Sequence, residues 1–301
     1  MSTRFTFQIY LPTQEKYHRF QTFDSCSHVA LAKYIQNNDD SMVVDTFKYI
    51  IKTSCIDDID VESISIIDIF CILLNLRIMS ISQLYEYDGV TQTDKERIKQ
   101  TQKLDLYDVL DLVTNFETEY ITRIDTNLGY SVSLKTPRHL MIESVEDLVI
   151  DMLDTIEIEG KQHNLSKLSC SQKESILDSL PGDLLPEIIS YIKLMDAKYR
   201  IKVFKNTADT ELNSIELKLF DNSMYNFLKA MFNCNLQEQY YIRYLMVKQL
   251  RFTLSDVENL SPIDTQNYIN LFREELEEQR KAQEKSIGNT NTNTKNLNNT
   301  M

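Results

Sequence analysis

The chain has 301 residues, enough for one large or two modest globular units that each bury a core. Hydrophobic residues make up 42% of it and aromatic residues 10%, which excludes an intrinsically disordered chain, and only five glycines and five prolines leave little turn chemistry for β-sandwiches or glycine-rich nucleotide loops. The formal net charge of −13 counts against phosphate backbones and anionic membrane surfaces as partners.

The N-terminal part of the sequence predicts a hairpin followed by two helices. Residues 4–10 alternate apolar and polar side chains, a proline breaks the pattern, and residues 18–23 can return as a second strand. Apolar residues at helical spacing then predict one short helix over residues 29–35 and another over residues 42–55. The polar residues 37–40 between them predict a turn.

The most apolar stretch of the chain predicts a central core helix over residues 66–79. Ser65 precedes it as an N-cap, with Asp68 three residues on in the manner of a capping box. A membrane span needs about 20 largely uncharged residues. This stretch is interrupted by Asp68, Asn75 and Arg77, so we expect it in a protein core.

The periodic pattern weakens between residues 84 and 134. The polar residues 91–103 give way to residues 118–123 and 130–134, which alternate like short strands. We expect a β-containing insertion here.

Helical spacing resumes after Pro137. Apolar residues at positions 145–156 predict an amphipathic helix with acids on its opposite face. An S-x-x-E pattern at Ser171 and Glu174 predicts the cap of a second helix, and the Pro-Gly pair that follows separates it from a third over residues 184–192.

A second hairpin and two aromatic-rich helices come next. Residues 199–204 and 215–220 each alternate apolar with polar residues and predict the strands. Apolar and aromatic residues at helical spacing predict helices over residues 225–232 and 236–246.

The C-terminal part predicts a short helix and a long projecting one. Ser255 with Glu258 predicts the cap of the short helix, and Pro262 after a serine opens the last. The last helix becomes almost wholly charged over residues 274–285, so we expect it to leave the body of the protein there. Its apolar residues before that point, which we expect to dock a partner, are Tyr268, Leu271 and Phe272.

These elements predict an α+β fold that is mostly helical, made of helical units with short β-hairpins and a projecting C-terminal helix. We expect an N-terminal hairpin with helices over residues 1–83, the β-containing insertion over residues 84–136 and a helical domain over residues 137–287. Residues 288–301 are uncharged-polar and rich in Asn and Thr, which predicts a disordered tail.

The sequence lacks the usual motifs of catalysis, nucleotide binding and metal binding. No glycine-rich phosphate loop, H-E-x-x-H or G-x-S-x-G occurs, the four histidines lack the spacing of a helical metal site, and the five cysteines form no C-x-x-C pair. We expect no enzyme, no cofactor and no metal, with reduced thiols and solvent-facing histidines. An enzyme would need several of Asp151, Asp154, Glu157 and His163 to converge in a concave site.

One basic, aromatic stripe keeps a further alternative open. It consists of Tyr240, Tyr241, Arg243, Tyr244, Lys248 and Arg251. Such side chains can form a platform for a single-stranded nucleic acid or a surface for a host factor. The net charge favours the other interpretation, a packed aromatic helix whose cations meet neighbouring acids.

Three regions carry a resemblance to a known family. Residues 59–80 combine an acidic turn, an apolar helix centred on Asp68 and the run Leu-Asn-Leu-Arg. Residues 130–137 form a strand-to-proline passage, with a helix-turn-helix region following over residues 171–186, and residues 244–273 contain Leu-Ser-Pro before a charged helix. Together these regions resemble the T-even-type bacteriophage baseplate hub and hub-assembly proteins.

The resemblance implies a non-enzymatic virion or assembly protein that docks to other baseplate hub or tail proteins. It implies no membrane, makes nucleic acid an unexpected partner and leaves the oligomeric state open. The location that it implies is the host cytoplasm during assembly, with the tail baseplate of the virion as the place of a component that stays in the particle.

Overall fold

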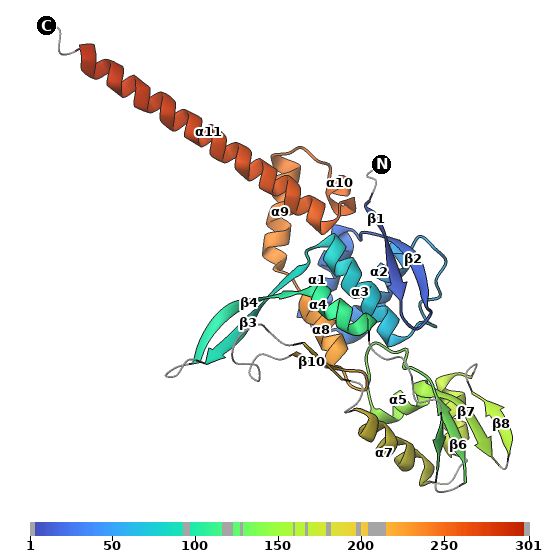
Figure 1. Cartoon of the computed structure of the whole chain (residues 1–301). Helices are drawn as coiled ribbons and strands as arrows, with labels where there is room; N and C mark the ends of the chain where they lie inside the picture. The colour runs from blue at the N-terminus through green and yellow to red at the C-terminus, as the bar shows by residue number, and fades with distance from the viewer. Residues whose placement is uncertain are drawn as a thin grey trace.

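The computed structural model describes residues 4–92, 97–115, 123–126, 129–158, 160–165, 168–178, 182–196, 200–203 and 215–297. These residues form a mostly helical α+β fold with short antiparallel sheets, as the sequence predicts (Figure 1). A long C-terminal helix projects from the body, and a β-hairpin and a lobe built around a small sheet extend from its other sides.

The N-terminal part confirms the predicted hairpin and the three helices after it. Its elements are β1 (Thr6–Leu11), β2 (Lys16–Gln21), α1 (Ser25–Gln36), α2 (Asp40–Ser54) and α3 (Ile66–Ser80). The two strands pair antiparallel, and α3 packs against β1 and α2. Because α3 is apolar on all sides, it is buried on all sides, and it forms the centre of the core.

The N-terminus of α3 holds the hairpin in place. Ser65 caps the helix as predicted, since its hydroxyl accepts the backbone N–H of Asp68 at 3.1 Å. The carboxylate of Asp68 does not complete the predicted capping box, because it binds Thr13 instead. It accepts hydrogen bonds from the backbone N–H of Thr13 at 3.0 Å and from the hydroxyl of the same residue. The turn between β1 and β2 is thereby tied to the central helix.

A long hairpin and a helix follow, namely β3 (Leu84–Gln92), β4 (Arg97–Asp105) and α4 (Leu106–Thr114). Of the polar residues 91–103, the described positions 91–92 and 97–103 lie in these strands, which their weak pattern did not predict. The core covers the base of the hairpin, where Leu104 is buried and Tyr85 is partly buried. Residues 118–122, most of the next predicted strand, lie outside the described residues.

A four-stranded antiparallel sheet combines strands from both sides of Pro137. The strands, in spatial order, are β5 (Ile124–Asp125), β6 (Ser131–Leu134), β7 (Leu153–Ile158) and β8 (Lys161–Asn164). The predicted helix over residues 145–156 is therefore wrong in its second part, because α5 (Val145–Met152) ends where β7 begins. β-branched residues such as Thr155 and Ile156 favour the strand, and β6 supplies its ladder partner.

Helices α6 (Cys170–Asp178) and α7 (Leu184–Asp196) pack against α5. The cap of α6 is Ser169 and not Ser171, because the hydroxyl of Ser169 accepts the backbone N–H of Gln172 at 3.3 Å. The buried Nζ of Lys173 donates to the carbonyls of Ile150 and Leu153, both at 2.8 Å. This lysine satisfies carbonyl groups at the end of α5.

The second predicted hairpin is confirmed as β9 (Arg200–Val203) and β10 (Ile215–Lys218), followed by α8 (Ser223–Phe232). Helix α8 packs against α3, and the ring of Phe232 lies 5.8 Å from that of Phe23 and 5.3 Å from that of Phe47. One continuous cluster of buried apolar side chains extends from Ile9 in β1 to the end of α8.

The last three helices have a small core of their own. They are α9 (Leu236–Lys248), α10 (Leu254–Asn259) and α11 (Pro262–Leu297). The buried apolar residues of this C-terminal unit are Ile242, Met246, Val257, Leu260 and Ile269. The capping box of α10 is formed by Thr253 with Asp256, and not by Ser255 with Glu258. Helix α11 extends past residue 288, into the segment whose composition predicts disorder.

Two of the histidines are buried, although we expected all four to face solvent. His18 lies in β2, and His28 lies in α1 beside the aromatic ring of Phe23. The Nε2–H group of His28 donates to the carbonyl of Phe232 at 3.2 Å. Phe232 lies at the end of α8, 204 positions later in the sequence. Burial lowers the pKa of His28 to about 4, with a further contribution from the nearby Arg77.

Candidate protein interfaces

The C-terminal unit, α9 to α11, is attached to the N-terminus of α1 through Ser25. The backbone N–H and the hydroxyl of Ser25 both donate to the carbonyl of Leu260, at 2.8 and 2.9 Å. Its hydroxyl also lies 3.1 Å from the Thr265 hydroxyl, and its own carbonyl accepts from Arg243 Nη2 at 2.9 Å. These contacts join α1 to α9, to the end of α10 and to α11.

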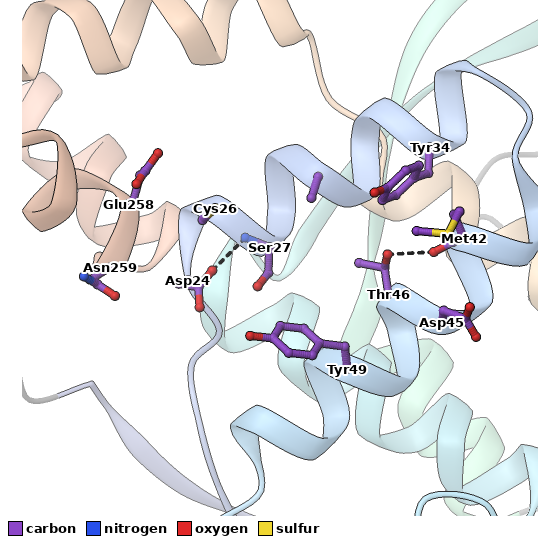
Figure 2. A pocket seen from close by; sticks show the side chains of 11 residues that line it. Asp24, Cys26, Ser27, Tyr34, Met42, Asp45, Thr46, Tyr49, Glu258 and Asn259 are labelled. Atoms are coloured by element: carbon purple, nitrogen blue, oxygen red, sulfur yellow. Dashed lines mark hydrogen bonds between the residues drawn. The ribbon is translucent and has the colours of Figure 1, made fainter.

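An open groove of about 590 Å³ results from this attachment, between α1, α2 and α10 (Figure 2). Figure 2 shows Tyr34 and Met42 near the turn that joins α1 to α2, and Glu258 from α10 at the opposite end. The ring of Tyr49 lies between these ends, below Ser27, and the side chain is 57% exposed. The remaining lining residues are Asp24, Cys26, Ala30, Asp45, Thr46 and Asn259.

The chemistry of this groove suits apolar contact more than catalysis. Its lining contains no histidine and no lysine or arginine. Asp24 is already paired with Arg4 at 3.2 Å, and Glu258 lies 3.6 Å from Arg243. A groove that contains an exposed tyrosine and a methionine and is edged by carboxylates is the kind of surface that anchors a side chain of another protein.

A second open groove, of about 560 Å³, lies where the N-terminal strand, the end of α3 and the start of α11 meet. Phe5, 60% exposed, and Tyr107, 43% exposed, line it together with Met79 and Ile263. Phe5 and Tyr107 could not be predicted as exposed from the sequence, because an aromatic residue beside a strand or at a helix start has no pattern that separates exposed from buried positions.

Helix α9 displays aromatic side chains on the side away from its core. Tyr240, Tyr244 and Val247 are exposed and follow one another at i, i+4 and i+7, so they share one face. Arg243 of the basic stripe points inward instead, where it is bonded to Ser25. Because that cation meets groups of its own chain, the stripe loses part of the basic surface that a nucleic-acid platform needs.

The three residues predicted to dock a partner lie at the base of the projecting part of α11. Leu271 is 62% exposed, and Tyr268 is 42% exposed with its ring at 5.1 Å from that of Phe252. Phe272 is half-buried. Positions 271 and 272 lie three and four residues after position 268, so both side chains are neighbours of Tyr268 on the helix surface. The three residues therefore form one apolar patch.

The four residues that an enzyme would bring together lie in α5 and in the four-stranded sheet, where Asp154 and Glu157 belong to β7. Asp151 is buried and accepts the backbone N–H groups of Arg138 at 2.5 Å and His139 at 3.2 Å. Glu157 pairs with Arg123 at 3.1 Å, and His163 lies on the exposed strand β8. Neither groove is lined by any of the four.

The described part of the chain shows neither a metal-binding cluster nor a membrane-spanning helix. Among these residues, no group of three or more His, Cys, Asp and Glu side chains is placed to hold a metal ion. Within the same residues, no helix has both the length and the apolar character needed to cross a membrane.

Comparison with known proteins relates most of the sequence to one protein family. A family model described as "T4 bacteriophage base plate protein" matches residues 2–224. No curated protein and no solved structure matches the chain. The matched residues end within α8, so α9 to α11 lie beyond them.

Proposed function

The chain belongs to the T4 bacteriophage base plate protein family, and we propose that it is a non-enzymatic structural or assembly component of the baseplate hub. In this role it acts through contacts with other hub or tail proteins. It works in the host cytoplasm during assembly and belongs to the tail baseplate if it stays in the particle.

The observation that carries the proposal is the apolar patch of Tyr268, Leu271 and Phe272 at the base of the projecting helix. Large apolar side chains that lie together on a surface mark sites of protein contact, and two of these three, Tyr268 and Leu271, are exposed. Tyrosine and phenylalanine supply much of the binding energy at such contacts, since they bury a large area at a small cost in side-chain entropy. We propose this patch as the main docking site.

The groove around Tyr49 is the second contact surface in this proposal. It is formed partly by the core and partly by α10, so a partner seated there contacts both. A hub component that binds at the groove and at the patch would therefore hold the C-terminal unit against the core.

The test is affinity capture of the tagged full-length protein from phage-infected cells, with the captured chains identified by mass spectrometry. We expect the unmodified chain to recover baseplate or tail proteins, and Leu271→Asp to lose them. Asn270→Asp is the matched control, because it adds the same charge at the neighbouring, exposed position of α11. Circular dichroism and thermal melting of the variants should be unchanged.

Three results would contradict the proposal. One is a chain that is captured alone, another is the recovery of metabolic enzymes or nucleic-acid factors in place of tail proteins, and the third is equal capture by Leu271→Asp and the unmodified chain. Tyr49→Asp separates the two surfaces, since we expect it to weaken capture without abolishing it if the patch is the main site.

A further inference from the structure

The projecting part of α11 carries a continuous uncharged seam. Beyond Ile269, which is buried in the C-terminal unit, the seam consists of Phe272, Leu276, Gln279 and Gln283. These positions follow one another at alternating intervals of three and four, the heptad spacing of a coiled coil. Over residues 273–284, every other position except Ala282 is charged. The uncharged positions therefore form one stripe along the helix.

This part of α11 gains little packing from its own chain. Side chains 273–284 are all exposed, and an exposed helix in water gains most of its stability from packing or from many side-chain pairs. Glu275 accepts from Gln279 Nε2 at 3.2 Å, and Arg280 lies 3.8 Å from Glu284. The second pair has its cation on the N-terminal side, which is the less favourable order. A second helix along the seam would supply the missing packing.

We propose that α11 pairs in parallel with α11 of a second copy of this chain, as a two-stranded coiled coil. The charges beside the seam select this partner and this direction. Glu275 lies on one side of the seam and Arg280, five residues later, on the other. In a parallel pair, Glu275 of each copy faces Arg280 of the other, so two opposite-charge pairs form by symmetry.

The antiparallel arrangement is opposed by the same residues. It would place Glu275 opposite Glu275 and Arg280 opposite Arg280, and like charges at these positions are repulsive. The glutamines in the seam weaken the pair but favour a single register, as polar residues at such positions do. Association is therefore expected to be reversible and concentration-dependent.

Pairing leaves only part of the docking patch accessible, because Phe272 belongs to both the seam and the patch. Leu271 lies about 120° around the helix from the centre of the seam, given about 100° per residue. The second copy would thus cover Leu276 and leave Leu271 open to another protein. The inference concerns two copies of the same chain, so it stands or fails independently of the proposed hub contacts.

Sedimentation equilibrium of the full-length protein at low salt tests the proposal. We expect the unmodified chain to form dimers, and Glu275→Arg or Arg280→Glu alone to weaken dimerisation by about tenfold, because each makes both cross-pairs repulsive. An equimolar mixture of the two variants should dimerise like the unmodified chain, since each then meets its opposite charge. Glu274→Arg is the matched control, with the same change of charge on the side of the helix away from the seam.

Each alternative result overturns the proposal. If the protein is a monomer at every concentration, α11 does not pair with a second copy. If the control Glu274→Arg weakens association as strongly as Glu275→Arg, the effect comes from net charge and not from facing residues. Failure of the mixture to restore dimers shows that the two residues do not face each other. A trimer would contradict two-stranded pairing.

Discussion

Asp68 of the central helix and Thr13 of the first hairpin turn are joined across 55 positions of sequence, by a carboxylate that accepts both the backbone N–H at 3.0 Å and the hydroxyl of one residue. The carboxylate is fully covered, and burial raises the pKa of Asp68 while the bonds from Thr13 act against that rise. The hairpin is therefore held to the core by a polar contact as well as by its apolar face.

Removal of this carboxylate is expected to destabilise the protein. Asp68→Ala leaves the backbone N–H of Thr13 without its acceptor, while the Thr13 hydroxyl keeps its contact with the Ser65 hydroxyl at 3.1 Å. The change should lower the free energy of unfolding by about 1–3 kcal/mol. Asp68→Asn keeps one acceptor oxygen and should cost less. Urea unfolding followed by circular dichroism measures both, and equal stability of all three proteins would show that the contact contributes little.

His28 is expected to make stability depend on pH. Its pKa is lowered to about 4 in the folded protein, mainly by burial, whereas in the unfolded chain it is about 6.5. Unfolding takes up a proton between these values, so the contribution is complete above about pH 6.5 and is lost as the pH falls towards about 4. The free energy of unfolding should fall by up to about 1.4 kcal/mol per pH unit in this window.

His28→Gln should flatten that dependence, since an amide can still donate to the Phe232 carbonyl but does not titrate. The matched control is His163→Gln, which replaces an exposed histidine on β8. Urea unfolding at several pH values between 4 and 7.5 measures the slopes. Equal slopes for His28→Gln and the unmodified protein would assign the pH dependence to other groups.

Lys173 is expected to decide where α5 ends. Lys173→Met keeps most of the side-chain length but leaves the carbonyls of Ile150 and Leu153 without their buried donor, which should cost about 2–3 kcal/mol. Lys161→Met, at an exposed position of β8, is the control. Hydrogen exchange should quicken in α5 and β7 of the first variant only; unchanged protection there would mean that the ladder with β6 alone holds the boundary.

Ser25 is expected to hold the C-terminal unit on the core. Ser25→Ala removes the hydroxyl bonds to Leu260 and Thr265, at a cost of about 1 kcal/mol, and keeps the backbone bond. Ser63→Ala removes an exposed hydroxyl bond of similar length and serves as the control. Amide exchange should quicken in α9 and α10 while that of α3 stays the same. Uniform quickening throughout the protein would show that the unit and the core unfold together.

The parts of the fold that could be predicted are those fixed by neighbours in sequence. The apolar run of α3 and its Ser65 cap are local, and so is the proline that opens α11. The end of α5 could not be predicted, because its carbonyls are satisfied by Lys173 from another helix. The burial of His28 likewise depends on Phe232, 204 positions away.

The candidate interfaces also differ in whether they depend on residues near in sequence or far apart. The patch on α11 is predicted from three apolar residues just before a charged run, and its docking role stays a prediction. The groove around Tyr49 could not be predicted, because α10 reaches α1 through the contact of Ser25 with Leu260, 235 positions apart. The exposure of Tyr49 also depends on tertiary packing, because a tyrosine at this position of α2 could equally well be buried in the core.

The long helix that leaves the C-terminal unit has a mechanical consequence. Its 36 residues span about 54 Å at 1.5 Å per residue, and its first turn is fixed to α1 where Thr265 meets Ser25. A rod that is held at one end acts as a lever arm. A tilt of a few degrees at that fixed end moves the far end by several ångströms, so a small rearrangement of α1 would be amplified into a displacement that a distant neighbour can detect.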